Sequence, residues 1–492
     1  MCWAPSRSAG GCKRPCELSF DQTRTGLDVR RFTSAIPDGP ESGANLGKLR
    51  MLDACRSLAV DRRTMLGGGL GGALLLSSGM SFSSPLPTPV SRIGLGATSF
   101  SDQLFIEGFT FTDGKREART TAELQRLMMA HGGNEVFTRL GSSRMVVGQR
   151  RGRGIAAALV RAALARSVNL PLNPELLLCA HYGDMAGQPE PDFSGFPEIK
   201  LSRPWHELAL AEMCEAMRIY GRLTAREILG TGVRVNVWDI GNEVEFGIAG
   251  VAIPPMVPTI GGADWHYKAP DNVDPEIGKM SLGRFFGMAP PEQVAWGKAH
   301  LWPYVGRIMA AVAEGIREVD PKAVFATHAS AIASLMPEVF VGFYEAVDAA
   351  GFRTRDLGVS YYPTNTRLIH DRFALFKKTA STAMQRLGRP IYIAEFGYAA
   401  GPVTYGGQDW ANPVDGYPCT PKGQADFLRD LTEWGVRSGM ISGIRPWAPD
   451  FVGSTWQGMA LFEAPKDGVS MARPALFAIQ QGKRLARRGR RN

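Results

Sequence analysis

The 492-residue sequence has few cysteines, and their placement supports neither a disulfide framework nor a metal site. Four of the seven cysteines precede residue 92, which leaves Cys179, Cys214 and Cys419 for the rest of the chain. Three widely spaced cysteines do not make a disulfide scaffold, and no CxxC or Cys/His spacing typical of zinc occurs. The main part of the chain is therefore predicted to fold without disulfides or a structural metal.

The sequence also lacks an apolar run long enough to cross a bilayer as a mature helix. In the stretch DRRTMLGGGLGGALLLSSG, Arg62 and Arg63 precede only a short uncharged run rich in Gly and Leu. This stretch resembles a twin-arginine export signal, although Asp61 stands where Ser or Thr is usual. We expect a bacterial protein exported to the periplasm or the extracellular space, with Met51 as the true start. A mobile, slightly apolar tail is the alternative.

The main part of the chain has no net positive charge, although the whole sequence carries a formal net charge of +9. Residues 1–92 contribute +5 and the last ten residues, KRLARRGRRN, contribute +6, so residues 93–482 carry −2. The basic excess thus belongs to the two ends. A nucleic-acid partner is not expected for the globular part, and the basic end is predicted to be solvated.

Strand-type and helix-type patterns alternate from about residue 100 onward. Eight strands with intervening helices fit a single (β/α)8 TIM barrel with enlarged βα loops. An open doubly wound sheet is the alternative, but no G-x-G-x-x-G follows the first strand, which argues against its dinucleotide-binding form. The predicted strands are LFIEGFTF (104–111), EVFTRLG (135–141), ELLLCAHYGD (175–184), VNVWDIGNE (235–243), AVFATHAS (323–330), LGVSYYP (357–363), IYIAEFGY (391–398) and ISGIRPWAP (441–449), and the predicted helices include 121–132, 206–229, 291–319, 373–388 and 423–439.

These patterns predict three segments in the chain. Residues 1–92 form a disordered extension with the export signal, residues 93–482 form the barrel, and residues 483–492 form a basic C-terminal tail. No internal repeat and no long linker divides the barrel. The stretch 248–290, rich in Pro, Gly and Met, is predicted to be a long rim loop after the fourth strand, where it could shape a substrate cleft.

Two glutamates follow apolar strand runs. The run VNVWDIGNEVEFG places Glu243 at a strand end, and RPIYIAEFGYAA does the same for Glu395. Strand carboxyl ends form the rim at which barrels build active sites. Two carboxylates at one rim are typical of glycosidases, in which one acid protonates the leaving oxygen and the other attacks the anomeric carbon. Taken alone, either glutamate could instead be a solvated loop acid or a helix-cap neighbour.

Polar and aromatic residues end most of the other predicted strands, which is costly in a core unless the strand ends form a site. Asn242 could bond a sugar 2-hydroxyl, and Trp447 offers a flat apolar face to a sugar ring. Arg139 and Tyr362 are placed to keep Glu395 ionised. A structural ion pair for Arg139 and a core position for Trp447 are the alternatives.

Histidines end the third and fifth predicted strands, at His181 and His328. Both are candidate substrate-binding residues. Buried, hydrogen-bonded histidines with a structural role are the more common alternative.

Five stretches lie in order along the chain: HYGD (181–184), IGNE (240–243), DLGVSYYP (356–363), IAEFGYA (393–399) and YPCTPKGQADFLRDL (417–431). Together they resemble glycoside hydrolase family 53, the arabinogalactan endo-β-1,4-galactanases, within the large clan of barrel glycosidases. The last stretch is much harder to reach by chance than the Asn-Glu pair of the second. The resemblance extends from about residue 100 to residue 465, nearly the whole barrel.

The resemblance implies a retaining mechanism, with Glu243 as acid/base, Glu395 as nucleophile, and the two carboxyls roughly 5 Å apart. It also implies substrate contacts from His181 and Tyr182, and action on β-1,4-galactan or arabinogalactan. A barrel glycosidase acting on another β-glycan, such as a mannan or a glucan, is one alternative. A non-catalytic sugar-binding barrel is the other, and the presence of both glutamates favours the enzyme.

The chain departs from the family in two loops, and a third loop raises a question about metal. After HYGD it reads MAGQPEPD, without the usual tryptophan, and RPWAPDF lacks the acid and second aromatic that commonly follow the strand-eight tryptophan. Some bacterial members bind calcium, for which Asp409, Asn412 and Asp415 offer oxygen ligands, but a solvated turn is the favoured interpretation. We therefore expect no cofactor, a polysaccharide or oligosaccharide partner, no stable membrane insertion, and a monomer.

Overall fold

In the computed structural model, the residues that can be described begin at 88 and include most of the barrel. The export signal predicted around Arg62 and Arg63 and the predicted start at Met51 lie outside the described residues, so both stay predictions. The described residues all belong to one unit, Arg50–Asn492. They are 88–144, 154–255, 267–366, 369, 371–405 and 408–489.

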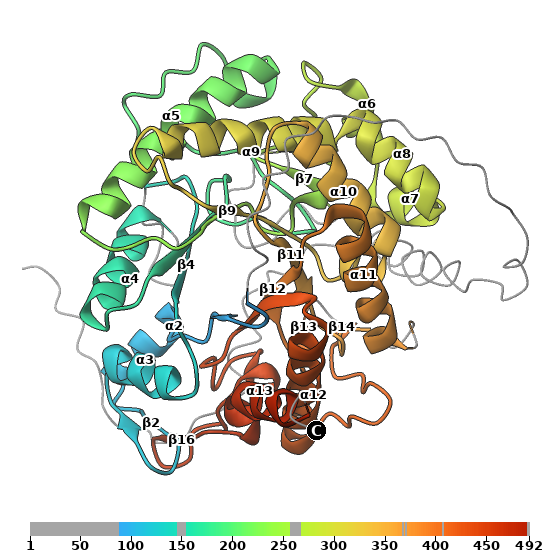
Figure 1. Ribbon diagram of the computed structural model, residues 1–492. Helices are drawn as coiled ribbons and strands as arrows, with labels where there is room; N and C mark the ends of the chain where they lie inside the picture. The colour runs from blue at the N-terminus through green and yellow to red at the C-terminus, as the bar shows by residue number, and fades with distance from the viewer. Residues whose placement is uncertain are drawn as a thin grey trace, which may run out of the picture. The chain divides into compact units, whose positions relative to one another are not determined.

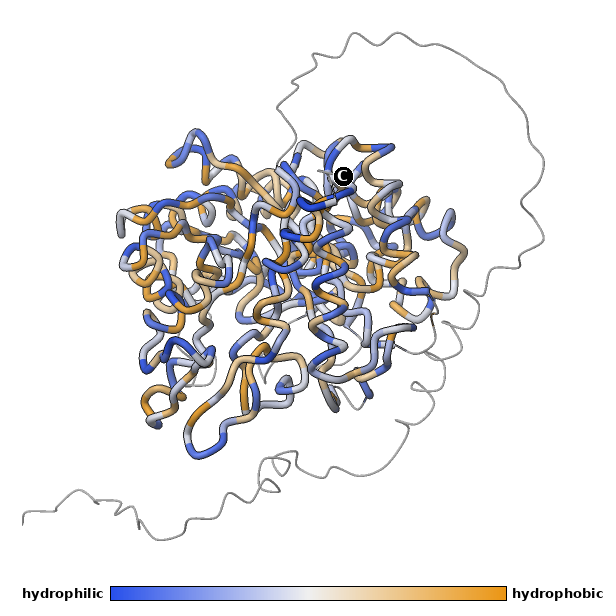
Figure 2. Tube along the Cα trace, turned by 60° about the horizontal axis from the view of Figure 1, so that its bottom comes forward, coloured by the Kyte–Doolittle hydropathy of each residue, from blue (hydrophilic) through white to orange (hydrophobic). Residues whose placement is uncertain are grey.

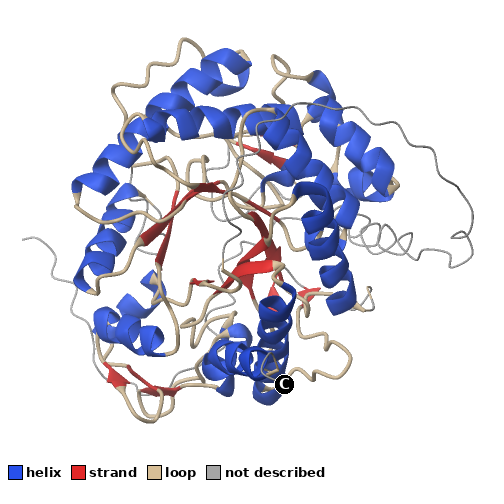
Figure 3. Cartoon of the chain, viewed as in Figure 1, coloured by secondary structure: helices blue, strands red, loops and turns tan. Residues whose placement is uncertain are grey.

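Eight parallel strand positions form a ring within the described residues, and the helices surround it (Figures 1 and 3). The strand pairs fall into two sheets, ordered β4-β5-β6-β9 and β10-β11-β12-β15-β1. The fifth position continues from β9 to β10, and Asn134 N donates to Ile93 O at 3.0 Å where β1 meets β4. The predicted (β/α)8 barrel is therefore confirmed. Its strands are β1 (Arg92–Ile93), β4 (Val136–Leu140), β5 (Leu172–Leu176), β6 (Trp238–Ile240), β9 (Phe325–Ala326), β10 (His328–Ala329), β11 (Leu357–Tyr361), β12 (Ile391–Phe396) and β15 (Ile441–Pro446).

The surrounding helices bury one apolar side against the strands, and hydrophobic and hydrophilic segments alternate along them (Figure 2). Thr120 and Thr420 cap α3 and α12, each accepting a hydrogen bond from a backbone N–H three residues on. None of the described helices is long and apolar enough to cross a membrane. The helices are α2 (Ser99–Ile106), α3 (Thr121–Ala130), α4 (Ile155–Ser167), α5 (Leu210–Gly230), α6 (Pro275–Lys279), α7 (Leu282–Gly287), α8 (Pro290–His300), α9 (Trp302–Arg317), α10 (Pro337–Ala349), α11 (Arg372–Leu387), α12 (Pro421–Ser438) and α13 (Ala478–Arg488).

Several short strands lie outside the ring of barrel strands. The stretch 248–290 is less irregular than a single rim loop, because it contains a strand and two short helices, α6 and α7. The added strands are β2 (Thr110–Thr112), β3 (Glu117–Ala118) and β16 (Val469–Met471) in one sheet, the hairpin β7 (Gly247–Ile248) with β8 (Val251–Ala252), and the hairpin β13 (Thr404–Tyr405) with β14 (Gln408–Asp409).

Four boundaries differ from the predictions. The first barrel strand is β1, whereas most of 104–111 belongs to helix α2 and to the outlying strand β2. The third strand ends at Leu176, before the predicted HYGD end. The helix predicted over 291–319 is two helices, because Pro303 near the start of α9 has no N–H to continue α8. Helix α13 also runs through the predicted tail boundary at 483.

Two kinds of interior lie on either side of the strands. Between strands and helices the buried side chains are apolar, with Trp238, Trp302 and Phe343 among the largest. Inside the ring, charged side chains are buried instead, including Arg139, Glu175 and Arg445. Buried charges are stable only when they are paired, so the ring interior must be a connected ionic network.

Candidate active site

Glu243 occupies a tight turn immediately after β6. Gly241 has a φ of 80°, and Glu243 itself is left-handed, with φ 53° and ψ 55°. A Cβ at Gly241 would approach Val244 Cγ1 to 2.3 Å, so the turn requires glycine there. A left-handed glutamate costs about 1–2 kcal/mol relative to ordinary backbone. The turn holds Glu243, which is only 8% exposed, and Met185 N donates to its Oε2 at 3.3 Å.

Glu395 lies within β12, and cationic and hydroxyl groups hold its carboxylate. Arg139, on β4, donates from Nη2 to Glu395 Oε1. The Tyr362 hydroxyl, just after β11, donates to Glu395 Oε2 at 2.6 Å. Both oxygens of a buried carboxylate are therefore satisfied, as the sequence predicted for these two partners.

Asn242 and His328 link the two glutamates. Arg139 Nη2 also donates to Asn242 Oδ1 at 2.9 Å, so one guanidinium contacts both Glu395 and the neighbour of Glu243. Asn242 Nδ2 donates to Gly183 O at 2.8 Å, which fixes Oδ1 as the acceptor. His328 Nε2, 2.9 Å from Oδ1, must then be the protonated ring nitrogen.

The surroundings shift the pKa values of the two glutamates in opposite directions. Burial raises the pKa of Glu243 well above its ordinary value, and the neighbouring carboxylates Glu395 and Asp184 raise it further. Burial alone would raise the pKa of Glu395 too, but the Arg139 guanidinium, then His328 and the Tyr362 hydroxyl, outweigh burial and hold it below its ordinary value. The surroundings thus favour the protonated form of Glu243 and the ionised form of Glu395.

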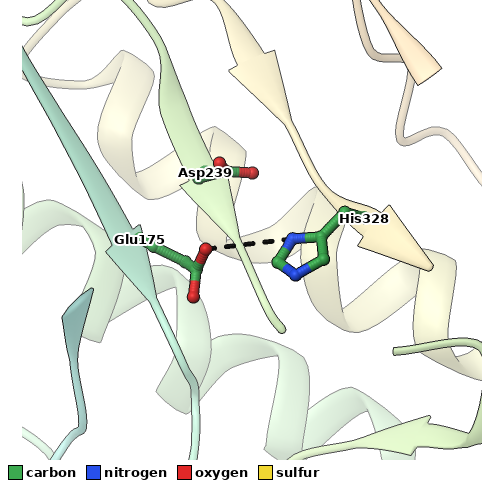
Figure 4. Close-up of side chains that lie close together, drawn as sticks. All are labelled: Glu175, Asp239 and His328. Carbon is green, nitrogen blue, oxygen red and sulfur yellow. Dashed lines mark ion pairs between the residues drawn. The ribbon is translucent and has the colours of Figure 1, made fainter. Parts of the chain in front are cut away.

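A second group of ligand-type side chains lies deeper in the ring, where Glu175 from β5, Asp239 from β6 and His328 from β10 face one another (Figure 4). Their candidate ligand atoms lie within 4.8 Å of one another. Arg445, however, donates to Glu175 Oε2 at 2.9 Å and to Asp239 Oδ2 at 3.4 Å. A guanidinium already pairs with both carboxylates of the group, so we treat it as part of an ion-pair network.

Half-buried aromatic rings form one side of the site. Trp410 packs edge-on against Tyr362, with ring centroids 5.5 Å apart, and against Trp456 at 5.3 Å. Trp447, which follows β15, lies 6.5 Å from Trp456, and the Arg139 guanidinium lies 4.9 Å from the Trp447 ring. Such a surface can stack against the apolar faces of sugar rings.

The histidine and tyrosine of HYGD differ in their relation to this arrangement. Both follow β5 in a loop instead of ending the strand, so the predicted position of His181 is wrong. The described interactions of His181 are with Asp192, and those of Tyr182 are with Asp184 and Arg139. Tyr182 therefore borders the site, whereas nothing in the described contacts connects His181 to either glutamate.

The residues considered for calcium are bonded within their own turn. Asp409 Oδ1 accepts from Ala411 N at 2.8 Å, and Asn412 Nδ2 donates to Asp409 O at 2.8 Å. These bonds are those of an Asx-type turn, and the solvated turn without calcium stays a prediction.

Residues 288–486 match the model of glycosyl hydrolase family 53. The chain is a glycosidase. The predicted family resemblance and enzyme class are thereby confirmed. The glycosidase match includes Tyr362, Glu395 and Trp447, and it begins after Arg139 and Glu243.

Solved structures agree with the glycosidase fold. The GH53 catalytic domain of Ignisphaera aggregans superposes with a TM-score of 0.55 at 15% identity, covering 81% of this chain and 97% of that one. Fungal β-1,4-galactanases superpose with a TM-score of 0.56 at 16% identity, covering 79% and 99%. At these identities the likeness shows the barrel fold alone. No curated protein sequence matches this glycosidase.

Sequence reasoning missed several residues that build the site. Glu175, Asp239 and Arg445 lie inside predicted strands, where an isolated charge in an apolar run is the signal of a buried ion pair. Trp410 and Trp456 lie in loops, and no periodic pattern marks them. Their proximity to Tyr362 comes from long-range folding.

Proposed function

We propose that this glycosidase hydrolyses β-1,4-galactan with retention of configuration, using Glu243 as acid/base and Glu395 as nucleophile. The observation that carries the proposal is the opposite displacement of the two pKa values in one buried site. A protonated acid beside an ionised carboxylate is what double displacement at an anomeric carbon requires.

In the first step, the Glu243 carboxyl gives its proton to the glycosidic oxygen as the bond from that oxygen to the anomeric carbon breaks. A Glu395 oxygen attacks the same carbon and forms a glycosyl-enzyme ester. In the second step, ionised Glu243 takes a proton from water, the water oxygen attacks the anomeric carbon, and Glu395 leaves as carboxylate. Arg139 and Tyr362 stabilise Glu395 whenever it is ionised.

Galactan is the proposed substrate because the family resemblance and the fungal β-1,4-galactanase fold both lead to it. The aromatic surface of Tyr362, Trp410, Trp447 and Trp456 supports a polymeric sugar substrate, since several rings lie side by side. The predicted carboxyl separation of roughly 5 Å is part of the proposal.

Purified full-length protein tests this proposal against β-1,4-galactan, arabinogalactan, mannan, xylan and β-glucans, with reducing-sugar release as the readout. We expect release from galactan, formation of the retained anomer in early NMR spectra, and loss of more than about 10⁴-fold in rate for Glu395→Gln. The control is Glu345→Gln, at a surface glutamate paired with Lys298 and Arg386. Inversion, or near-normal turnover by Glu395→Gln, would contradict the mechanism, and release from mannan alone would contradict the substrate.

A further inference from the structure

Arg139 is held from behind by a carboxylate that has no place in the chemistry described so far. Glu175, on β5, is fully buried, and its Oε1 accepts from Arg139 Nε. Its Oε2 accepts from Arg445 Nη2 at 2.9 Å. Glu175 therefore bridges two guanidiniums, one of which contacts Glu395.

The bond to Nε determines where Arg139 points. A guanidinium is a rigid planar fork, so fixing the Nε–H direction also fixes the direction of both Nη groups. Nη2 is shared by Asn242 and Glu395, and Nη1 has no hydrogen-bond partner among the described residues. Trp447 and Phe137 contact the Arg139 guanidinium only through their rings. Glu175 is thus the described partner that orients Arg139 from the side opposite the substrate.

Arg445 anchors Glu175 in turn. It donates from Nε to Ala394 O, the carbonyl immediately before Glu395, and from Nη1 to Asp239 at 3.4 Å. Its guanidinium also lies 3.6 Å from the Phe137 ring centroid. Arg445 therefore connects the orientation of Glu175 to the backbone of the strand that carries Glu395.

We propose that Glu175 is a positioning residue, which holds the Arg139 guanidinium in the orientation that contacts Glu395. The inference rests on the proposed function, in which Glu395 is the nucleophile. Without the Glu175 carboxylate, Arg139 keeps its charge but loses the charge-assisted bond that orients its fork toward Glu395, and a glutamine amide oxygen can replace it only with a weaker, neutral bond.

The test is the pH profile of kcat/KM for Glu175→Gln on galactan. With Arg139 misdirected, Glu395 is held ionised less well, so the acidic limb moves to higher pH and kcat falls by about 100-fold, while KM changes little. If Glu175 acted only as a nearby negative charge, its removal would move the limb to lower pH, because a like charge raises the pKa of a carboxyl. A shift to lower pH, or no shift, overturns the proposal.

The pH of the acidic limb depends on every charged or titratable group that faces Glu395 or its immediate neighbours. These are Arg139 from β4, Glu175 from β5, Tyr182 and Asp184 from the loop after it, Asp239 from β6, Glu243 and Glu245 after it, His328 from β10, Tyr362 after β11 and Arg445 from β15. Only Glu175 is changed in the test, so the direction of the shift reports on Glu175.

Asp239→Asn is the matched control. Asp239 is as buried as Glu175 and also pairs with Arg445, but its described hydrogen bonds do not reach Arg139. We expect no shift of the acidic limb to higher pH. An equal upward shift for Asp239→Asn would overturn the proposal, since loss of any network charge would then suffice.

Circular dichroism shows whether each variant folds, and Glu175→Asp provides a second variant for the test. The aspartate keeps the charge but is one methylene shorter, so kcat and the acidic limb should lie between those of wild type and Glu175→Gln. If Glu175→Gln does not fold, the aspartate carries the same directional test. Wild type and Glu395→Gln are run alongside. Inactive wild type contradicts the proposed function and this inference together, whereas active wild type with inactive Glu395→Gln leaves the shift to decide on Glu175 alone.

Discussion

The surroundings of Glu243 and Glu395 differ far more than their burial does. The two residues are 8% and 5% exposed, so both are largely hidden from water. Around Glu395 lie a guanidinium and a phenol that donate to its oxygens. Around Glu243 lie other carboxylates, and its hydrogen-bond partners are Met185 N, at 3.3 Å, and the Ser360 side chain.

This difference teaches that burial alone assigns neither carboxyl a role. Burial raises both pKa values, and only the arrangement of partners separates them. Arg139 approaches Glu395 from β4. The same guanidinium also donates to Asn242, the residue next to Glu243. Removing the partners of Glu395 one at a time should therefore make its surroundings resemble those of Glu243.

Arg139→Met removes the largest difference between the two sides. Glu395 and Glu175 are then buried without their shared cation, so the pKa of Glu395, the proposed nucleophile, rises. We expect kcat to fall roughly 1000-fold, as for loss of a preorganised charge partner, and the acidic limb to move to higher pH. Breaking a buried pair should also cost about 3–5 kcal/mol of unfolding free energy.

Arg389→Met is the control for that stability loss. Arg389 is also buried and pairs with Asp348, but its described contacts do not include Glu395. Urea unfolding should show a comparable loss of stability, while the pH profile stays in place. An unchanged acidic limb in Arg139→Met would contradict the assigned partnership.

Tyr362→Phe makes a smaller change on the same side. It removes the 2.6 Å hydroxyl donor to Glu395 but leaves the ring in the aromatic surface. A hydrogen bond to a charged group contributes about 1.5 kcal/mol, so kcat should fall roughly 10-fold, with a slight rise of the acidic limb. Tyr344→Phe, whose hydroxyl donates to the carbonyls of Thr327 and Gly358, should leave the profile unmoved. Equal profiles for the two variants would exclude a role for the Tyr362 hydroxyl in holding Glu395 ionised.

Glu243→Gln tests the raised pKa of Glu243 through the pH dependence of protein stability. A group whose folded pKa is raised stabilises the fold fully below its unfolded pKa, and that contribution is lost as pH rises through the folded pKa. Wild type should therefore lose stability relative to Glu243→Gln as pH increases, measured as a difference in thermal midpoint that grows from pH 5 to pH 9. Each kcal/mol corresponds to roughly 2–4 °C.

Glu212→Gln should show the opposite sign. Hydrogen bonds from Ala209 N and Ser202, and the charge of Arg203, lower the pKa of Glu212, so its contribution is present above the unfolded pKa and lost in acid. This variant should be slightly less stable than wild type near neutrality, with the difference vanishing at low pH. A thermal difference for Glu243→Gln that does not grow with pH would contradict the raised pKa.

The sequence was sufficient to predict contacts among residues at the barrel rim, but not contacts among the charged residues inside the ring. Glu243, Glu395, Arg139 and Tyr362 each follow or end an apolar run, and a parallel barrel brings such ends together whatever the loops do. The contacts among them were therefore predictable. The charges below the rim were not, because a lone Glu175 or Arg445 in a strand shows that a partner is needed without showing which one.

Local patterns also failed where one periodicity imitated another. The run at 104–111 has the apolar character of a strand, but Thr98 caps a helix that takes in Leu104 to Ile106. The first barrel strand is only two residues long, too short for any periodicity to mark it. In the same way, HYGD continues an apolar run beyond Leu176, which concealed the end of β5 and misplaced His181.

The left-handed backbone of Glu243 bears on the stability of the fold. A glutamate here combines an unfavourable φ, burial and neighbouring carboxylates, each of which opposes folding. Glycine or asparagine would relieve the backbone and remove the carboxyl at once. Replacement of Glu243 by either residue should therefore stabilise the fold, so the protein carries this glutamate at a cost in stability.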